Sequence, residues 1–98
     1  RGPVDMVFAL ALIHHLAISN NLPFDKIASF FNKLCNYLVI EFVPKEDSQV
    51  QRLLRAREDI FYSYSQDNFE DSFQKYFKIV KQIKVQSSTR IIYLMEGK

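Results

Sequence analysis

Glycine is almost absent from this 98-residue sequence, where it occurs only at positions 2 and 97. Loops that cradle a phosphate or a dinucleotide need internal glycines, because only glycine lets backbone amides approach the ligand closely. These residues therefore contain neither a Walker-type nor a dinucleotide-binding loop. Cysteine is equally scarce, and Cys35 alone forms neither an internal disulfide nor a thiolate metal cage. A single thiol indicates a reducing compartment, so we expect a cytoplasmic protein held together by packing.

Neither sign of charge is in excess. Thirteen Lys and Arg residues face eleven Asp and Glu residues, which gives a net charge of +2. This balance argues against a nucleic-acid arm, a polybasic membrane tail and a disordered acidic tail. The apolar run over residues 4–12 contains Asp5 and is too short to cross a bilayer, so we expect neither a membrane partner nor a targeting segment. With 48% apolar residues, the chain suffices for one small domain.

Apolar runs and helical periodicity alternate along the chain, which predicts an α/β fold. The expected elements are, in chain order, a strand at 4–10, a short helix at 12–18, a helix at 23–35 with Pro23 as its first residue, a strand at 37–43, a helix capped at 47 or 48 and ending near 54, a loop at 58–66, a helix starting at 65 or 67 and ending at 77, and strands at 78–85 and 90–96. The first two strands should be parallel and the last two an antiparallel hairpin.

The two outermost strands of the sheet are identified by different features. Lys78, Lys81 and Lys84 punctuate the strand at 78–85, and lysines discourage an exposed edge from pairing with another chain, so this strand should form the rim. The strand at 90–96 should then lie inside the sheet. The strand at 4–10 is as apolar as an interior strand, yet no earlier strand in the chain covers its second edge. We expect either that more polypeptide precedes Arg1 or that two copies pair through this edge.

Two stretches resemble a known family. Residues 5–16 read Asp-Met-Val-Phe-Ala-Leu-Ala-Leu-Ile-His-His-Leu and resemble the fourth-strand segment of class I S-adenosylmethionine-dependent methyltransferases, which commonly read D-x-V-x-x-x-x-x-x-H-H-L. Residues 38–47 read Leu-Val-Ile-Glu-Phe-Val-Pro-Lys-Glu-Asp and resemble their fifth strand and following loop, as found in methyltransferases related to nodulation proteins. The resemblance covers nearly the whole chain.

The resemblance implies that residues 1–98 are a single partial domain, the C-terminal half of a Rossmann-like methyltransferase sheet. Such a half has two parallel strands plus an antiparallel terminal hairpin, flanked by helices, with the seventh strand between the fifth and the sixth. The glycine-rich cofactor loop and the acidic residue that holds the ribose would both lie before Arg1. The chain would then supply one wall of the cofactor site. We expect it neither to bind S-adenosylmethionine tightly nor to be active alone.

The candidate cofactor and catalytic residues follow the first strand. By the resemblance, Leu10, Ala11 and Leu12 contact the cofactor, and simple core packing is the alternative for these apolar residues. His14 is the candidate general base, because histidine titrates near neutral pH. The alternative is that His14 caps the short helix or fills a cleft wall. We expect no metal, since His14 and His15 point about 100° apart on a helix and no third ligand stands at a suitable spacing.

The candidate substrate-binding residues lie on and after the second strand. Glu41 interrupts an apolar strand, where an ionised carboxylate needs a partner, either a structural one or a substrate amine. Pro44, Lys45 and Asp47 follow that strand at the edge where ligands collect in open α/β sheets. A solvated charged turn is the alternative for this loop.

These residues lead to two functional hypotheses. The first is a fragment of a methyltransferase that acts on a small-molecule or glycan-like acceptor and relies mainly on holding that acceptor in line with the methyl group. In this hypothesis Tyr62 and Tyr64 are either lid residues or buried anchors. The second is a non-catalytic α/β interaction domain that forms a homodimer through its first strand.

Overall fold

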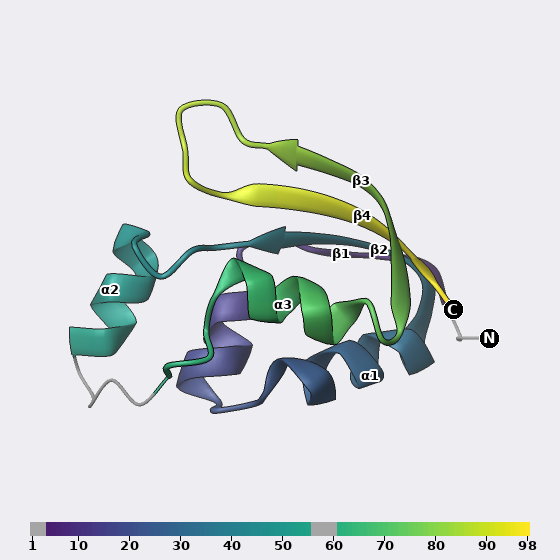
Figure 1. Ribbon diagram of the computed structural model, residues 1–98, viewed down its shortest axis with the longest axis horizontal. Coiled ribbons are helices and arrows are strands. Elements are labelled where there is room, and N and C mark those ends of the chain that lie inside the picture. Colours follow the sequence, from purple (N-terminus) through teal and green to yellow (C-terminus); the bar gives the residue numbers. More distant parts are fainter. Residues whose placement is uncertain (1–3, 56–60) are drawn as a thin grey trace.

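A four-stranded mixed sheet with helices packed against it organises the chain (Figure 1). The computed structural model describes residues 4–55 and 61–98. The elements are, in chain order, β1 (Val4–Ala9), the π-helix η1 (His15–Ser19), α1 (Phe24–Leu34), β2 (Cys35–Phe42), α2 (Ser48–Arg55), α3 (Gln66–Phe73), β3 (Phe77–Lys84) and β4 (Ile91–Gly97). The strands follow the order β1-β2-β4-β3 in the sheet.

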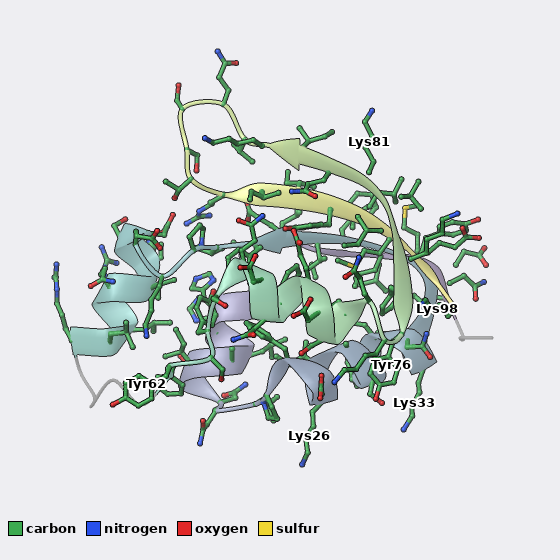
Figure 2. All side chains as sticks on the ribbon, viewed as in Figure 1. Lys26, Lys33, Tyr62, Tyr76, Lys81 and Lys98 are labelled. Carbon is green, nitrogen blue, oxygen red and sulfur yellow. The ribbon has the colours of Figure 1, made fainter. Side chains whose placement is uncertain are left out.

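This strand order confirms the topology expected from the sequence. β1 and β2 pair in parallel, and the connection through η1 and α1 joins them. β4 pairs antiparallel with both β2 and β3, so it lies inside the sheet. The lysine-bearing strand β3 forms one rim and β1 the other. In Figure 2, Lys81 projects outward from β3, as a residue that protects an open edge should.

The core lies between the sheet and the helices. Figure 1 shows α1, α3 and η1 beneath one face of the sheet, and the strand residues on that face are buried. Except at Cys35 and Glu41, they alternate with exposed or half-buried positions, as the two-residue period of a strand requires. The buried strand residues on this face include Ala9, Leu38, Ile40, Phe42, Phe77, Tyr93 and Met95. From α3, Phe69 packs against Phe42 at a ring-centroid distance of 5.0 Å and against Tyr93 at 5.2 Å.

The opposite face of the sheet is apolar and exposed along β1. Val4, Met6 and Phe8 point to this face, and 66% of Phe8 is accessible to solvent. The pairing register continues the Phe8 row through Val39 and Leu94 to Lys81 at the rim. Parallel strands in α/β proteins are normally covered on both faces. Within residues 4–55 and 61–98, helices cover only one.

Several element boundaries differ from the sequence prediction. Pro23 precedes α1 with an extended ψ of 152°, so the helix begins one residue later than predicted. Cys35 was assigned to that helix, but it is the first residue of β2, where its side chain is fully buried. α3 ends at Phe73 rather than Phe77, and Phe77 starts β3. For Cys35 and Phe77, a buried residue that fits the helical stripe belongs to the sheet, because the strand follows the helix with little or no linker.

The start of α3 and the loop ahead of it are anchored by specific side chains. Ser65 caps α3 by accepting a hydrogen bond from the Asn68 amide at 3.2 Å. Tyr64 is buried and donates a hydrogen bond to the Val43 carbonyl, so it is an anchor, whereas Tyr62 is exposed (Figure 2). Residues 58–60 of the expected loop lie outside the described residues. No helix among the described residues has the length and apolar character to cross a membrane.

Candidate functional site

The candidate residues meet at the end of the sheet where β1 and β2 have their carboxyl ends. This end is called the sheet edge, and it is distinct from the unpaired long side of β1. Because β4 runs antiparallel to β2, its first residues lie at this same edge: Ile91 pairs with Phe42, the last residue of β2. The edge therefore brings together the turn after β1, the loop after β2 and Arg90, the residue just ahead of β4. Ligands of open α/β sheets bind at the carboxyl ends of the parallel strands.

Arg90 and Asp47 form the best-defined ion pair of this edge. Arg90 Nε donates to Asp47 Oδ2 at 2.9 Å and Nη2 donates to Oδ1 at 3.2 Å, which is a bidentate pair. The hydrogen bonds from Arg90 lower the pKa of Asp47, and the same pair raises the pKa of Arg90. Both groups are therefore charged at neutral pH. Asp47 Oδ1 also accepts from the Gln49 amide at 2.9 Å, which ties the pair to the first turn of α2.

Glu41 has two partners within the chain. Its Oε1 accepts a hydrogen bond from the Ala11 amide at 2.7 Å and lies 3.6 Å from Nη1 of Arg90. Ala11 has a φ of 55°, in the left-handed region that a residue with a Cβ adopts at a cost. The carboxylate thus stabilises a strained turn while Arg90 balances its charge. Of the two kinds of partner expected for Glu41, the structure contains the structural kind.

The three residues implied in cofactor contact lie on the turn after β1. Leu10, Ala11 and Leu12 are all exposed, and half of Leu10 (51%) is accessible to solvent. Within the described chain these residues are therefore not part of the core, whereas the alternative expected core packing. They form an apolar ledge at the end of β1, beside the carboxylate of Glu41.

His14 lies beneath this ledge and is almost completely buried, at 1% exposure. Burial, together with the nearby His15 and Arg90, lowers its pKa to about 4, so the imidazole is neutral at physiological pH. Its Nδ1 has no hydrogen-bond partner among the described residues. His14 occupies the N-cap position of η1, the place that the helix-cap alternative gives it, but its side chain makes no capping hydrogen bond. No group of acidic, histidine or cysteine side chains in the described part of the chain is arranged to hold a metal ion.

The loop after β2 borders a hollow of about 400 Å³. Lys45 is anchored at both ends: its Nζ donates to the Phe61 carbonyl at 3.0 Å and its own carbonyl accepts from Gln51 Nε2 at 2.6 Å. The hollow is lined by Phe42, Pro44, Lys45, Glu46, Tyr64, Ser65, Gln66, Lys84, Thr89 and Ile91. Its hydroxyl, amide and aromatic groups, with charges of both signs, suit a polar uncharged ligand. Lys45 and Asp47 thus have partners within the chain, whereas Glu46 is exposed, as in the solvated turn that was the alternative.

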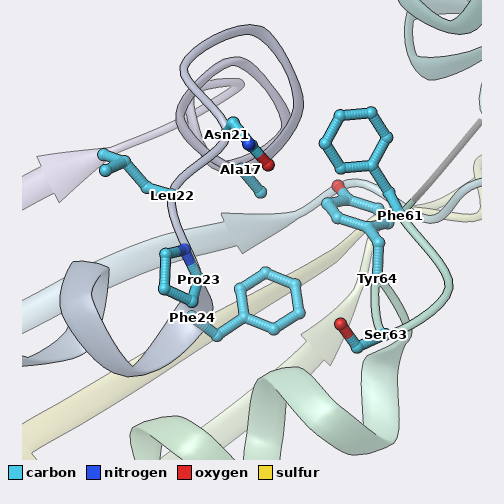
Figure 3. Close-up of a pocket in the computed structure, with 8 residues that line it drawn as sticks. All are labelled: Ala17, Asn21, Leu22, Pro23, Phe24, Phe61, Ser63 and Tyr64. Carbon is cyan, nitrogen blue, oxygen red and sulfur yellow. The ribbon is translucent and has the colours of Figure 1, made fainter. Parts of the chain in front are cut away.

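A second, smaller hollow of about 160 Å³ lies on the helical side of the chain (Figure 3). It is lined by Ala17, Asn21, Leu22, Pro23, Phe24, Phe61, Ser63 and Tyr64. Figure 3 shows the rings of Phe24, Phe61 and Tyr64 around it, with the Ser63 hydroxyl at its border. None of the candidate residues at the sheet edge lines this hollow.

Arg90 is the residue of this edge that the sequence prediction missed. It was treated only as the start of a strand, although it is the single charged residue ahead of an apolar run. The signal that could have identified Arg90 lies in the topology of the sheet. A strand that runs antiparallel to β2 must begin where β2 ends, so a charged residue in front of it faces Glu41 and the loop that follows.

The chain is homologous to part of a larger curated protein. Nodulation protein NoeA of Rhizobium meliloti (strain 1021) is 38% identical over 96 residues, which cover 98% of this chain and 20% of that protein. The name of this relative does not state a reaction. No family model and no solved structure matches the chain. The 98-residue chain spans about one fifth of the length of the curated relative it matches.

Proposed function

We propose that this chain is the C-terminal half of the sheet of an S-adenosylmethionine-dependent methyltransferase, acting in the cytoplasm on a small-molecule or glycan-like acceptor. The observation that carries the proposal is the position of the exposed ledge at residues 10–12 beside Glu41 and the loop after β2, all at one edge of a sheet ordered β1-β2-β4-β3. The match to one fifth of a longer protein is consistent with a partial domain.

The residues present fit one wall of a cofactor site. The exposed apolar ledge suits the flat, partly apolar body of such a cofactor, and the negative charge of Glu41 and Asp47 exceeds the single positive charge of Arg90, which suits a sulfonium. The cofactor would supply an electrophilic methyl group. A glycine-rich loop that would hold its other end has no counterpart in these 98 residues.

The acceptor would occupy the hollow beside Pro44 and Lys45, at the same end of the sheet as the ledge. Because the hollow presents hydroxyl, amide and aromatic groups, it suits a polar uncharged acceptor. His14 is the proposed base, because its imidazole is neutral and its Nδ1 has no partner among the described residues. Its side chain is buried and does not line the hollow, so proton transfer to it would require the site to open. Its pKa of about 4 makes it a weaker base than the ideal, which has a pKa near the working pH. Holding the acceptor in line would therefore supply the larger share of the rate enhancement.

A second candidate function is supported by the free edge of β1. In this proposal the chain is a non-catalytic interaction domain, and two copies pair through β1. The exposed apolar side chains of β1 favour association, and no lysine protects this edge as Lys81 protects β3. The two proposals differ in what covers β1: a strand from the same longer polypeptide, or β1 of a second copy.

Titration calorimetry with S-adenosylhomocysteine tests the first proposal. We expect no saturable binding to the 98-residue chain, and saturable micromolar binding to a polypeptide extended upstream by about 120 residues, roughly one domain. In the longer polypeptide, Leu10→Asp should weaken binding at least tenfold, because it puts a charge on the ledge. Leu22→Asp, a matched change of an exposed leucine away from the ledge, should not. Micromolar binding by the 98 residues alone, or none by the longer polypeptide, would contradict the proposal.

A further inference from the structure

Two hydrogen bonds hold the backbone of Arg90 in place, independently of its side chain. Its carbonyl accepts from the Val85 amide at 2.9 Å across the β3–β4 hairpin, and its amide donates to Ser88 Oγ at 3.0 Å. These hydrogen bonds fix the position of the Arg90 backbone, to which the side chain is attached. The guanidinium is mostly buried and reaches across the end of β2 to two carboxylates on different segments.

Each of those two carboxylates binds to, or belongs to, a segment that forms one wall of the proposed site. Glu41 accepts the amide of Ala11, which belongs to the ledge assigned to the cofactor. Asp47 accepts the amide of Gln49 and ends the loop assigned to the acceptor. Among the described residues no hydrogen bond joins Ala11 to Asp47 directly, and the guanidinium connects Asp47 to Glu41, the partner of Ala11.

We infer that Arg90 is a positioning residue, whose guanidinium holds the ledge at Ala11 and the loop at Asp47 as one unit through Glu41. The inference gives a role at the proposed methyl-transfer site to a residue that touches neither cofactor nor acceptor, and in that sense it rests on the proposed function. Arginine suits the task, because its planar fork binds one carboxylate through two hydrogen bonds and leaves a third nitrogen for another.

The charges around the Arg90 guanidinium explain why removing it would affect the turn at Ala11. The titratable groups that influence Arg90 are Asp47, Glu41 and Tyr64, and Asp47 is influenced by His14 as well. Without the guanidinium, two mostly buried carboxylates would repel each other at this edge. Glu41 would turn toward solvent, and the strained turn at Ala11 would lose the acceptor that stabilises it.

A double-mutant cycle read out by amide hydrogen exchange tests the inference. The variants of the chain are Asp47→Asn, Arg90→Met and the double variant, and the signal is the exchange rate of the Ala11 amide relative to that of Tyr93 in the core. We expect Arg90→Met to speed exchange at Ala11 roughly tenfold, the order of effect of losing a charge-assisted hydrogen bond. Asp47→Asn should speed it severalfold in the wild-type background, because Arg90 loses its anchor, but should slow it in the Arg90→Met background, because it removes the charge that repels Glu41.

Two results would overturn the inference: no response of Ala11 to Asp47→Asn, or the same response with and without Arg90. Lys75→Met is the matched control, because it removes a cation from the exposed pair with Asp25, on α1, and should leave Ala11 unchanged. If Arg90→Met does not fold, the same cycle is run with Arg90→Lys, which keeps the charge but loses the fork. The cycle needs no ligand, so a failure of the methyltransferase proposal in calorimetry would be distinguishable from a failure here.

Discussion

Replacing Phe69 by alanine should lower the free energy of unfolding by about 3 to 5 kcal/mol, the usual cost of emptying a fully buried phenylalanine site. The ring is completely buried on α3 and contacts four other aromatic rings. These are Phe24, Phe42, Phe73 and Tyr93, with ring centroids between 4.5 and 5.6 Å away. Because Phe69 joins α1, α3 and the sheet, its loss would leave a cavity that no single element can close. A small domain is stable by about 5 to 15 kcal/mol, so the variant would be barely folded.

Urea unfolding of the chain measures this effect, and Phe30→Ala is its control. The chemical change is the same, but Phe30 lies on the outer side of α1 with 59% of its surface exposed. The control should lose less than about 1 kcal/mol. Equal losses in the two variants would show that the aromatic cluster is not the centre of the core.

The second large effect concerns His14 and pH. Its pKa is about 4 in the folded chain, against 6.5 for an unburied histidine, so the unfolded state binds the proton first as the pH falls. The folded state therefore loses stability between about pH 6.5 and pH 4, by on the order of 3 kcal/mol at 1.36 kcal/mol for each pKa unit. Above pH 6.5 the residue is neutral in both states and contributes no pH dependence.

His14→Gln should flatten the stability profile over this range, because glutamine does not titrate. Denaturant unfolding at a series of pH values measures the profile. His15→Gln, a change at the exposed neighbour, should retain most of the wild-type slope, because burial is a larger cause of the lowered pKa of His14 than the charge of His15. An unchanged slope in His14→Gln would mean that the imidazole is not buried in its neutral form.

The sequence predicted the topology better than the element boundaries. Lysine placement on the strand at 78–85 located the rim, because the need to protect a free edge acts on the sequence directly. Cys35 and Phe77 were misassigned because a buried residue fits a helical stripe and a strand equally well where one element follows the other closely.

The candidate site was predictable only in part. Glu41 was selected as a charged residue within an apolar strand, and Asp47 by its position after that strand. The burial of His14 and the bridge made by Arg90 depend on how η1 and β4 pack, which no local pattern encodes. The exposed outer face of β1 was also unexpected, because an apolar run does not reveal whether its second layer belongs to the same chain.

Hydrogen exchange at the β1 amides tests most directly the central claim, that β1 is an interior strand whose outer neighbour lies elsewhere in a longer polypeptide. The amides to follow are those within Val4–Ala9 that do not bond to β2. The account predicts fast exchange in the 98-residue chain at every protein concentration, and strong protection once the upstream polypeptide is attached. Protection that appears in the 98-residue chain as its concentration rises, with no gain from the upstream polypeptide, would contradict the account and establish pairing between copies instead.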